Sequence, residues 1–378
     1  MKFNLSDICD YAKGKIDVAV LDEDTYISTE NMMPNKGGIT SASSLPTVVQ
    51  TQAFNAGDVL VSNIRPYFKK IWFAEYDGGC SNDVLVFRAK DGVSKRFLYY
   101  VLADDTFFDY SMATSKGTKM PRGDKAAIMK YEIPDFTFEE QEKIAGILEV
   151  LDKKIQINTA INDNLLQQAQ SIFAQEFLSL DSTPNGWQKS SLLGIADYLN
   201  GLAMQKYRPK ENEQGLPVLK IRELRQGSCD SNSELCSPYI KPEYIVHDGD
   251  VIFSWSGSLL VDLWCGGTCG LNQHLFKVTS STYDKWFYYA WTNHHLLKFA
   301  AIAADMATTM GHIKREELAK AEVLIPAQSD YDRIGNLLAP LYDLVISNRI
   351  ENRKLASLRD ELLPQLISGQ LDVSEVLL

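Results

Sequence analysis

The chain has 378 residues, of which 45% are hydrophobic and 10% aromatic, so it can form two or more domains with ordinary cores and is not a disordered protein. No run of 18 apolar residues occurs and Met1 opens onto polar sequence, so we expect neither a transmembrane helix nor a signal peptide. Six scattered cysteines suit a reducing compartment, and we expect a soluble, cytoplasmic protein.

The net charge of −11 is unevenly distributed along the chain. Residues 1–135 and 181–326 each carry a net charge of −2, whereas the shorter stretches 136–180 and 327–378 carry −4 and −3. A DNA-binding protein needs a local positive patch that meets phosphates, not a positive total. The acidic total therefore does not exclude a nucleic-acid partner.

The first segment, residues 1–135, is predicted to be a mixed module of short strands and a few helices. FNAGDVLVSNIRPYFKKIWFAEYDGGCSNDVLVFRA (54–89) alternates β-branched and aromatic residues with Gly and Asn turns, which is typical of strands. FLYYVLADDTF then has a helical pattern with an aromatic face. The polar stretch SKGTKMPRGDK (115–125) leads to a final strand that ends in Ile-Pro.

Residues 136–180 follow with a long amphipathic helix that begins at EEQEKIAGILEVLDKKI (139–155). Its apolar and Asn positions step by alternating fours and threes, which predicts a heptad seam of about four repeats. About 40 helical residues would make an arm of roughly 60 Å. The seam could lie on its own module, but it is longer than a typical globular helix, which favours pairing with a second long helix.

The turn formers of SLDSTPNGWQKS (179–190) separate this first half from a second, diverged copy in residues 181–326. HDGDVIFSWSGSLLVDLWCGGTCGLNQHLFKVT (247–279) is a loose partner of 54–89, with Gly57-Asp58-Val59 matching Gly249-Asp250-Val251. WFYYAWTNHHL repeats the aromatic helix, and ATTMGHIKREE (307–317) repeats the polar stretch before the final strand. ADYLNGL (196–202) resembles CDYAKGK (9–15).

Residues 327–378 repeat the long helix at an offset of 190, so that Ile144 matches Ile334 and Asn158 matches Asn348. The match runs for about 40 residues without a gap and indicates a duplication. The predicted fold class is α+β: two mixed modules joined by two long helices that form an antiparallel coiled coil with pseudo-two-fold symmetry. Pro340 lies inside the second helix, where we expect a kink or a restart.

In an antiparallel pair, the residue numbers of facing positions add to a constant, and a constant of 506 places apolar residues opposite apolar residues. It also places Asn158 opposite Asn348, and a seam Asn can fix the register at a cost in stability. The predicted seam residues are Ile144, Leu148, Leu151, Ile155, Asn158, Leu165, Leu341, Val345, Asn348, Leu355, Leu358 and Leu362.

Cationic loops recur at corresponding places in both modules, in the stretches IRPYFKK, SKGTKMPRGDK, KYRPK and KIRELR and near HIKRE. Arg and Lys side chains contact phosphates and read base edges. Such loops are more often solvated surface, and their recurrence is what favours DNA. The candidate DNA-binding residues are Arg65, Lys69, Lys70, Lys116, Lys119, Arg122, Lys206, Arg208, Lys220, Arg222, Arg225, His312, Lys314 and Arg315.

These segments resemble the specificity subunit of Type I restriction–modification systems over the whole chain. YISTENMMPNKGGI, GDVLVSNIRPYFKKIWFA and GCSNDVLVF resemble one target-recognition domain, and NGLAMQKYRP, GLPVLKIRELRQGS and LNQHLF resemble a second. The two long helices resemble the family's spacers. The resemblance implies that each domain reads half of a bipartite sequence in double-stranded DNA, and that the spacers set the gap and dock two methyltransferase subunits, leaving open whether restriction subunits join.

No catalytic motif accompanies these modules. The sequence contains no GxxxxGK[ST] phosphate loop and no Gly-rich nucleotide fingerprint, and the spacing of Cys229, Cys236, Cys265 and Cys269 misses the usual paired zinc pattern. We therefore expect a non-catalytic chain without a metal or cofactor. By the resemblance, S-adenosylmethionine and ATP with Mg²⁺ belong to partner subunits. The alternatives are a duplicated binding protein for a ligand other than DNA, with a helical dimerisation arm, and a hydrolase with an unrecognised site.

Overall fold

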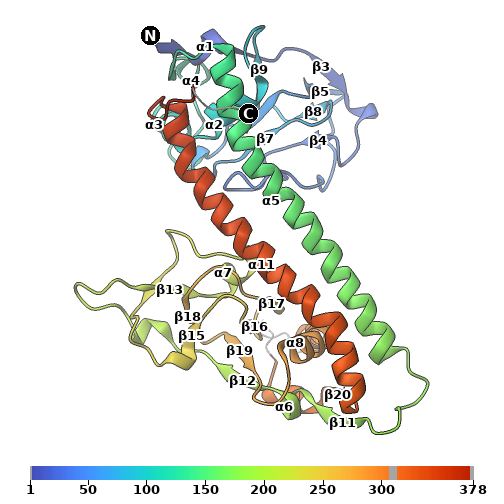
Figure 1. Cartoon of the computed structure of the whole chain (residues 1–378). Coiled ribbons are helices and arrows are strands. Elements are labelled where there is room, and N and C mark those ends of the chain that lie inside the picture. The colour runs from blue at the N-terminus through green and yellow to red at the C-terminus, as the bar shows by residue number, and fades with distance from the viewer. Residues whose placement is uncertain (1, 306–312, 375–378) are drawn as a thin grey trace. The chain divides into compact units, whose positions relative to one another are not determined.

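The computed structural model describes residues 2–305 and 313–374 of the chain (Figure 1). The described residues divide into two compact units, one formed by residues up to 154 together with those from 355 onwards, and the other by residues 155–354. Each unit contains one mixed module together with a segment of each of the two long helices. The predicted four-part division along the chain remains a prediction, since the units are assembled from segments distant in sequence.

The module of the first unit is built from two four-stranded sheets and a two-stranded pair. The pair joins the module's ends, β1 (Lys2–Asn4) with β10 (Glu132–Pro134), in antiparallel register. One sheet has the order β2-β9-β6-β7 and the other β3-β5-β8-β4. Their strands are β2 (Cys9–Tyr11), β3 (Lys15–Asp17), β4 (Tyr26–Ile27), β5 (Gln50–Phe54), β6 (Val59–Ser62), β7 (Ile71–Phe73), β8 (Gly78–Cys80) and β9 (Val84–Ala89).

Short helices complete this module and cover its main core. Buried side chains of α2, α3, β6 and β9 form one hydrophobic cluster, which also contains Ile144 and Leu366 of the long helices. Since these apolar faces are shared, the module is packed onto both helices of its own unit. The helices and 3₁₀ turns are α1 (Leu5–Ile8), α2 (Lys95–Ala103), α3 (Asp105–Ala113), α4 (Lys125–Ile128), η1 (Val18–Val20) and η2 (Pro66–Phe68).

The second module repeats this plan, which confirms the duplication predicted from the sequence. Its end strands pair in the same way, and its first sheet, β12-β19-β16-β17, corresponds strand for strand to β2-β9-β6-β7. The strands are β11 (Gln188–Ser191), β12 (Asp197–Asn200), β13 (Leu216–Leu219), β14 (Leu235–Cys236), β15 (Ile245–Val246), β16 (Val251–Ser254), β17 (Leu260–Leu263), β18 (Cys269–Leu271), β19 (Leu275–Thr279) and β20 (Glu322–Ile325).

The helices of the second module also follow the first, with α7 as an addition. They and the 3₁₀ turns are α6 (Leu192–Ile195), α7 (Ile221–Gln226), α8 (Lys285–His294), α9 (Leu296–Asp305), α10 (Arg315–Lys320), η4 (Met204–Lys206) and η5 (Pro242–Tyr244). The aromatic face of α8 is buried in the large core cluster of this unit. Each aromatic helix therefore lies where its counterpart does, against its module's first sheet.

The matching Gly-Asp turns show the duplication at atomic detail. Gly57 and Gly249 have φ values of +89° and +86°, a conformation that favours glycine. Each following aspartate accepts a backbone hydrogen bond at 2.8 Å from the residue three positions earlier, at Asp58 and at Asp250. Both turns lead directly into the central strand of the first sheet, so the two sheets start from the same local geometry.

The second sheets of the two modules differ at their edges. Both contain a parallel pair flanked by an antiparallel strand, namely β4·β8 with β5 and β13·β18 with β15. The fourth strand lies on opposite edges, because β3 pairs with β5 whereas β14 pairs with β13. The same framework therefore presents different loops in the two modules.

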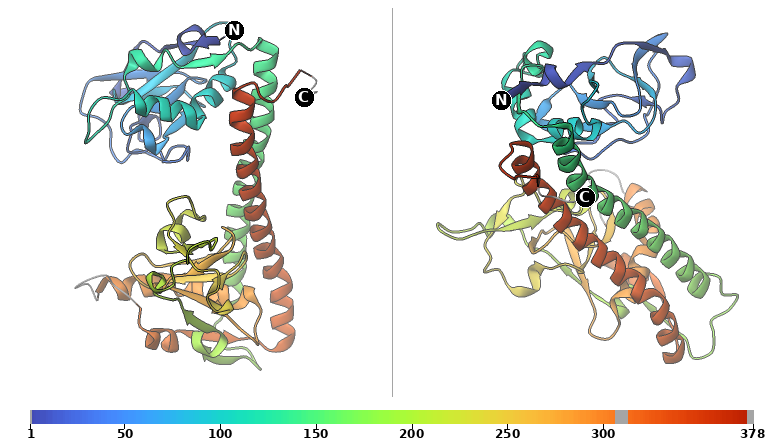
Figure 2. Two further views of the ribbon diagram at one scale, coloured as in Figure 1. Left: turned by 90° about the vertical axis from the view of Figure 1, so that its left-hand side faces the viewer. Right: turned by 45° about the horizontal axis from the view of Figure 1, so that its top comes forward.

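The long helices are α5 (Phe138–Phe173), which ends in a π turn, η3 (Ala174–Leu178), and α11 (Gln328–Ile367). Within each unit they lie side by side (Figures 1 and 2). α11 runs through Pro340 without a break, so the expectation of a restart is wrong, while the expectation of a kink stays a prediction. Pro340 lies on the exposed side, where water can satisfy the carbonyl of the exposed Asn336 that lacks its helical partner.

The register of the helix pair in the second unit differs from the predicted one by one helical turn. The Asn158 side chain donates to Asn352 Oδ1 at 2.9 Å, and the Asn348 side chain donates to Asn162 Oδ1 at 2.9 Å. Facing numbers therefore add to 510, not 506, and Asn158 does not face Asn348. The repeat offset of 190 exchanges the two pairs, as a pseudo-two-fold axis requires.

The physical reason for this shift is that it allows the side-chain amides of all four seam asparagines to form hydrogen bonds across the helix pair. With a sum of 506, Asn162 would face Leu344 and Asn352 would face Lys154. Neither of these amides would then face another amide as its hydrogen-bond partner. At 510 all four amides pair, and Leu165 still faces Val345. Buried amides without partners are costly, whereas apolar contacts are similar in both registers.

Most predicted seam residues are buried or half-buried, and one is not. Leu358 is 44% exposed, so its assignment to the seam is wrong. The neighbouring Arg359 turns inward instead and donates to Asp152 of α5 at 2.8 Å. The fully or nearly buried ones are Ile144, Leu148, Asn158, Val345 and Asn348, and the half-buried ones are Leu151, Ile155, Leu165, Leu341, Leu355 and Leu362.

Arg353 of α11 fastens the second module to its helix, and its removal is expected to destabilise this unit. The guanidinium donates to both oxygens of Asp248, at 2.7 and 2.8 Å. Arg353→Met should lower the free energy of unfolding by roughly 1–3 kcal/mol, because it leaves a half-buried carboxylate without its cation. Lys189→Met is the control: Lys189 pairs with Glu322 at 2.9 Å in the same unit, but the two side chains are 62% and 59% exposed, so a loss below about 1 kcal/mol is expected.

The Arg353 contribution should also depend on pH. The bonds from Arg353 hold the pKa of the Asp248 carboxyl below its usual value. A lowered folded-state pKa stabilises the protein above the unfolded-state pKa, and this stabilisation is lost as pH falls through the folded value. Urea titrations at neutral and acidic pH should therefore show that the free energies of unfolding of the unsubstituted protein and of Arg353→Met become more similar in acid. A difference that does not change with pH would contradict this role of Arg353.

Candidate nucleic-acid interface

Three loops of the first module are joined into one surface by backbone hydrogen bonds. The N–H groups of Asn35 and Lys36 donate to the carbonyls of Phe68 and Lys69, each at 2.8 Å. The N–H of Arg65 donates to the carbonyl of Pro121 at 2.8 Å. Segments near residues 35, 67 and 120 thus form a continuous platform that carries several predicted cations.

The backbone of this platform is strained. Asn35, Lys36, Arg65 and Lys69 have φ values of 55°, 60°, 51° and 50°, in the left-handed region that residues other than glycine and asparagine rarely adopt. At the three cationic residues this conformation costs about 1–3 kcal/mol each, and such strain clusters at functional sites. Their concentration on one loop surface points to a function for this platform.

The cations of the platform are held by neighbouring groups. Asp105 at the start of α3 binds Lys36 at 2.9 Å and Lys69 at 2.7 Å. Lys70 donates to the carbonyl of Thr29 at 2.6 Å, and its burial lowers its pKa. The Nε of Arg65 is buried without a hydrogen-bond partner among the described residues. Sequence reasoning missed Lys36, although the turn formers of MPNKGG mark an exposed loop there.

Further predicted residues of the first module lie on the adjacent hairpin. Lys116 pairs with Asp124, and Arg122 pairs with Asp83 at 3.0 Å. Lys119 is exposed at the tip. Tyr67 and Phe68 are 49% and 37% exposed, with ring centroids 4.7 Å apart. This surface therefore combines cations with exposed aromatic rings, a composition that suits contact with phosphates and bases.

In the second module, carboxylates form ion pairs with three of the predicted cations. Glu234 binds Arg208 at 2.8 Å and also binds Lys220. Arg222 binds the buried Glu223 at 2.6 Å, a bond that raises the pKa of the guanidinium. The other predicted cations, Lys206, Arg225, Lys314 and Arg315, are exposed, and His312 lies outside the described residues.

A hollow of about 460 Å³ lies beside Arg208, Lys220 and Arg222. It is lined by Gln205, Asn272 and Gln273, which sequence reasoning did not select. His274 of the polar loop LNQHLF also lines it, with its Nδ1 3.2 Å from the Ser256 hydroxyl. Gln and Asn amides can bond to adenine edges in a bidentate manner. The stretch LNQHLF gave a signal for Asn272 and Gln273, as a polar loop between strands, and Gln205 directly precedes the cationic stretch KYRPK.

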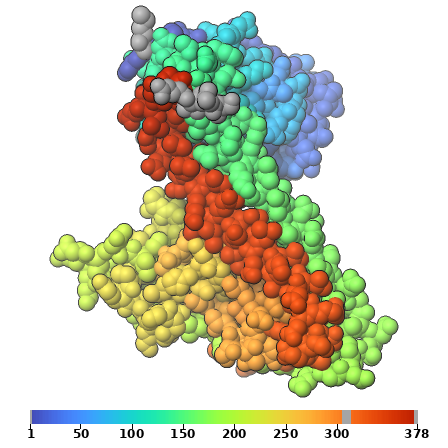
Figure 3. All heavy atoms as spheres, viewed as in Figure 1, coloured from blue at the N-terminus to red at the C-terminus, as the bar shows by residue number. Residues whose placement is uncertain are grey.

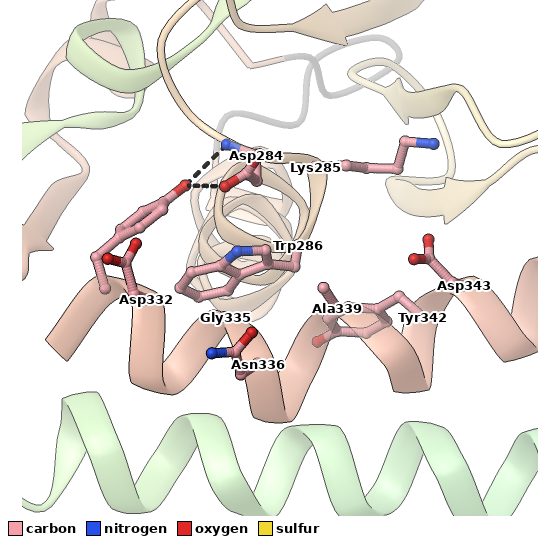
Figure 4. Close-up of a pocket in the computed structure, with 10 residues that line it drawn as sticks. Asp284, Lys285, Trp286, Asp332, Gly335, Asn336, Ala339, Tyr342 and Asp343 are labelled. Carbon is pink, nitrogen blue, oxygen red and sulfur yellow. Dashed lines mark hydrogen bonds between the residues drawn. The ribbon is translucent and has the colours of Figure 1, made fainter. Parts of the chain in front are cut away.

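A larger hollow of about 760 Å³ in the second unit does not suit a nucleic acid (Figure 4). It lies between the start of α8 and α11, and the Tyr331 hydroxyl closes one side by accepting from the Asp284 N–H at 2.8 Å. Asp284, Asp332 and Asp343 line it with a single lysine, Lys285. The excess of carboxylates would repel phosphates.

In the described parts of the chain, no group of three or more His, Cys, Asp or Glu side chains could hold a metal ion. Burial raises the pKa of the Cys265 thiol to about 11, so this cysteine is not poised as a thiolate. Within residues 2–305 and 313–374, no helix is both long and apolar enough to cross a membrane.

Comparison with known proteins gives matches over both halves. The family model for the Type I restriction modification DNA specificity domain matches twice, over residues 1–167 and 184–358. The Type I restriction enzyme MjaIX specificity subunit of Methanocaldococcus jannaschii is 26% identical over 310 residues, which cover 76% of this chain and 71% of that protein. The HindI specificity subunit of Haemophilus influenzae is 21% identical over 468 residues, covering 98% and 99%.

The fold has a counterpart among crystal structures. The S subunit of a Type I restriction–modification system from M. genitalium superposes with a TM-score of 0.56 at 16% identity, over 97% of this chain and 96% of that one. At this identity the likeness shows the fold alone.

Proposed function

Because the chain belongs to the family of Type I restriction modification DNA specificity domains, we propose that it is the non-catalytic DNA-recognition subunit of such a complex. Each module would read one half of a bipartite sequence in double-stranded DNA, and the paired helices would set the gap. The observation that carries the proposal is the pair of modules with one framework and different edges, β3 in one and β14 in the other. Like frameworks with unlike loops suit two unlike half-sites.

The loop surfaces support DNA as the ligand. In both modules, Lys and Arg side chains lie beside groups that can contact bases, the exposed rings of Tyr67 and Phe68 in the first and the amides of Gln205 and Gln273 in the second. Phosphate contacts position a protein on a duplex, and base contacts specify the sequence. A surface that serves DNA recognition needs both kinds of group.

The long helices suit protein partners, which we take to be two methyltransferase subunits. α11 leaves a strip of its side chains on the molecular surface (Figure 3). Ile157, Ile161, Leu337 and Leu344 of the helix pair are 40–55% exposed. Exposed apolar side chains on an otherwise acidic helix pair favour a protein partner over phosphate. Adenine methylation with S-adenosylmethionine would then belong to the partner, and ATP with Mg²⁺ to a restriction subunit if one joins.

Co-expression with a candidate methyltransferase subunit encoded in the same genome tests this proposal. Single-molecule sequencing of the host DNA should then find one methylated motif made of two short parts with a fixed gap. Omitting this chain should abolish methylation of that motif while the methyltransferase is still present. Methylation of a continuous motif, or of the same motif without this chain, would contradict the proposal.

Salt dependence separates the proposal from its alternative, a duplicated protein that binds something other than DNA. If several phosphates are contacted, affinity for a duplex should fall by orders of magnitude between 50 and 200 mM salt, with a slope of about −0.9 per phosphate. A ligand without phosphates would show no such slope.

A further inference from the structure

Each module contains one carboxylate whose two oxygens are held by two cations from separate segments. In the first module, Asp105 Oδ1 binds Lys36 at 2.9 Å and Oδ2 binds Lys69 at 2.7 Å. In the second, Glu234 Oε2 binds Arg208 at 2.8 Å and Oε1 binds Lys220. Three of these four cations are among those that the sequence marked as candidates for DNA contact.

This arrangement has the geometry of a phosphate site. A backbone phosphate of DNA also presents two unesterified oxygens, and cation–oxygen distances of about 2.7–2.9 Å are those of charge-assisted hydrogen bonds to either anion. Both carboxylates are ionised at neutral pH. Lys220 chiefly lowers the pKa of Glu234, while at Asp105 the two lysines outweigh the opposing effect of burial.

The two clusters lie where base contacts are also available. Lys36 and Lys69 belong to the strained platform that exposes Tyr67 and Phe68. Arg208 and Lys220 border the hollow of about 460 Å³ that contains Gln273. The first cluster thus lies on a strained backbone and the second lies beside a polar hollow, and neither feature is expected next to an ordinary surface ion pair.

We propose that Asp105 and Glu234 occupy backbone-phosphate sites in the free protein and must give way when a duplex binds, so that they hold down its affinity for DNA. The inference rests on the proposed function. On DNA of any sequence, the exchange of a carboxylate of the protein for a phosphate gains little, because one anion replaces another. Since the ion pairs must open on every duplex, the carboxylates weaken binding to all sequences by about the same factor.

The test uses the full-length protein with Asp105→Asn or Glu234→Gln, and two duplexes of equal length, with and without the methylated motif. At 50 mM salt, each variant should bind both duplexes about tenfold more tightly. The ratio of the two affinities should stay the same, because phosphate contacts carry no sequence information.

Matched controls are available in both modules. Glu132→Gln and Glu322→Gln remove the same charge from exposed pairs, Glu132 with Lys2 and Glu322 with Lys189, each at 2.9 Å. These variants should bind both duplexes as the unsubstituted protein does. If Asp105→Asn and Glu234→Gln behave like them, the inference is wrong.

Lys69→Ala separates the inference from a purely structural role of the ion pairs. If Asp105 only braces the platform, losing either partner should weaken binding. The inference instead requires opposite signs, because Lys69→Ala removes a phosphate contact and should weaken binding to both duplexes, whereas Asp105→Asn strengthens it. Weakening by both variants overturns the inference. If the unsubstituted protein shows no preference for the motif, the proposed function itself fails.

Discussion

Exchanging residues 1–135 for the corresponding module of a relative is expected to replace one half of the methylated motif and leave the other half and the gap unchanged. The buried side chains of each module form hydrophobic clusters with the long helices of that module's own unit. The second sheets of the two modules have their fourth strands on different edges. Methylation of the original motif should therefore disappear and a hybrid motif should replace it, as single-molecule sequencing would show.

The design of the exchange follows from contacts between the first module and α5. The Ser94 N–H donates to Gln141 at 3.0 Å, Arg96 pairs with Glu149 at 3.3 Å, and the Tyr100 hydroxyl donates to Asp152 at 2.8 Å. A donor module that keeps Arg and Tyr at these places, and any residue except proline at position 94, should pack on the original helix. The control is an exchange of a module from a relative with the same first half-site, which should leave the motif intact. A change in both halves of the motif would contradict independent reading.

Two double variants that differ in a single position are expected to have opposite effects on stability. Asn158→Ile with Asn352→Ile removes both members of one hydrogen-bonded pair and should leave the free energy of unfolding unchanged or raised. Asn158→Ile with Asn348→Ile removes one member of each pair. It leaves Asn352 and Asn162 without their donors, which should lower the free energy of unfolding by about 2–4 kcal/mol.

Urea unfolding followed by circular dichroism measures this difference in the full-length chain. Both variants carry two Asn→Ile changes in the same helices, so each controls for helix propensity and added apolar volume in the other. Equal stabilities, or the reverse order, would show that the amides do not pair as described. The first variant should also loosen the register, since seam amides restrict it.

Much of the fold was predictable because the duplication is visible in the sequence. Strands within 54–89, the aromatic helices and the end strands before Ile-Pro follow from local patterns of apolar, β-branched and turn-forming residues. The matching Gly-Asp turns at 57–58 and 249–250 needed only alignment of the copies. The family could likewise be named from motifs, and the double match of its model confirms it.

The helix register was not predictable from the heptad pattern. Sums of 506 and 510 both place apolar residues opposite each other, since a shift of one turn preserves a helical face. The choice depends on which register satisfies all four seam amides, and the apolar contacts used for the prediction did not include that condition. Leu358 and Arg359 show the same limit: the sequence favours the leucine for the seam, but Asp152 across the pair draws the arginine inward.

The duplication, the order of elements, the long helices and the cationic loops follow from local patterns and from comparison of the two copies, so they can be predicted without a structure. Which cations share a carboxylate, as Lys36 and Lys69 share Asp105, becomes visible in the folded chain alone. The same is true of the loops that form the platform and of the register of the helices. These features depend on contacts between residues far apart in the chain, where hydrogen bonding and burial, not local propensity, set the energy.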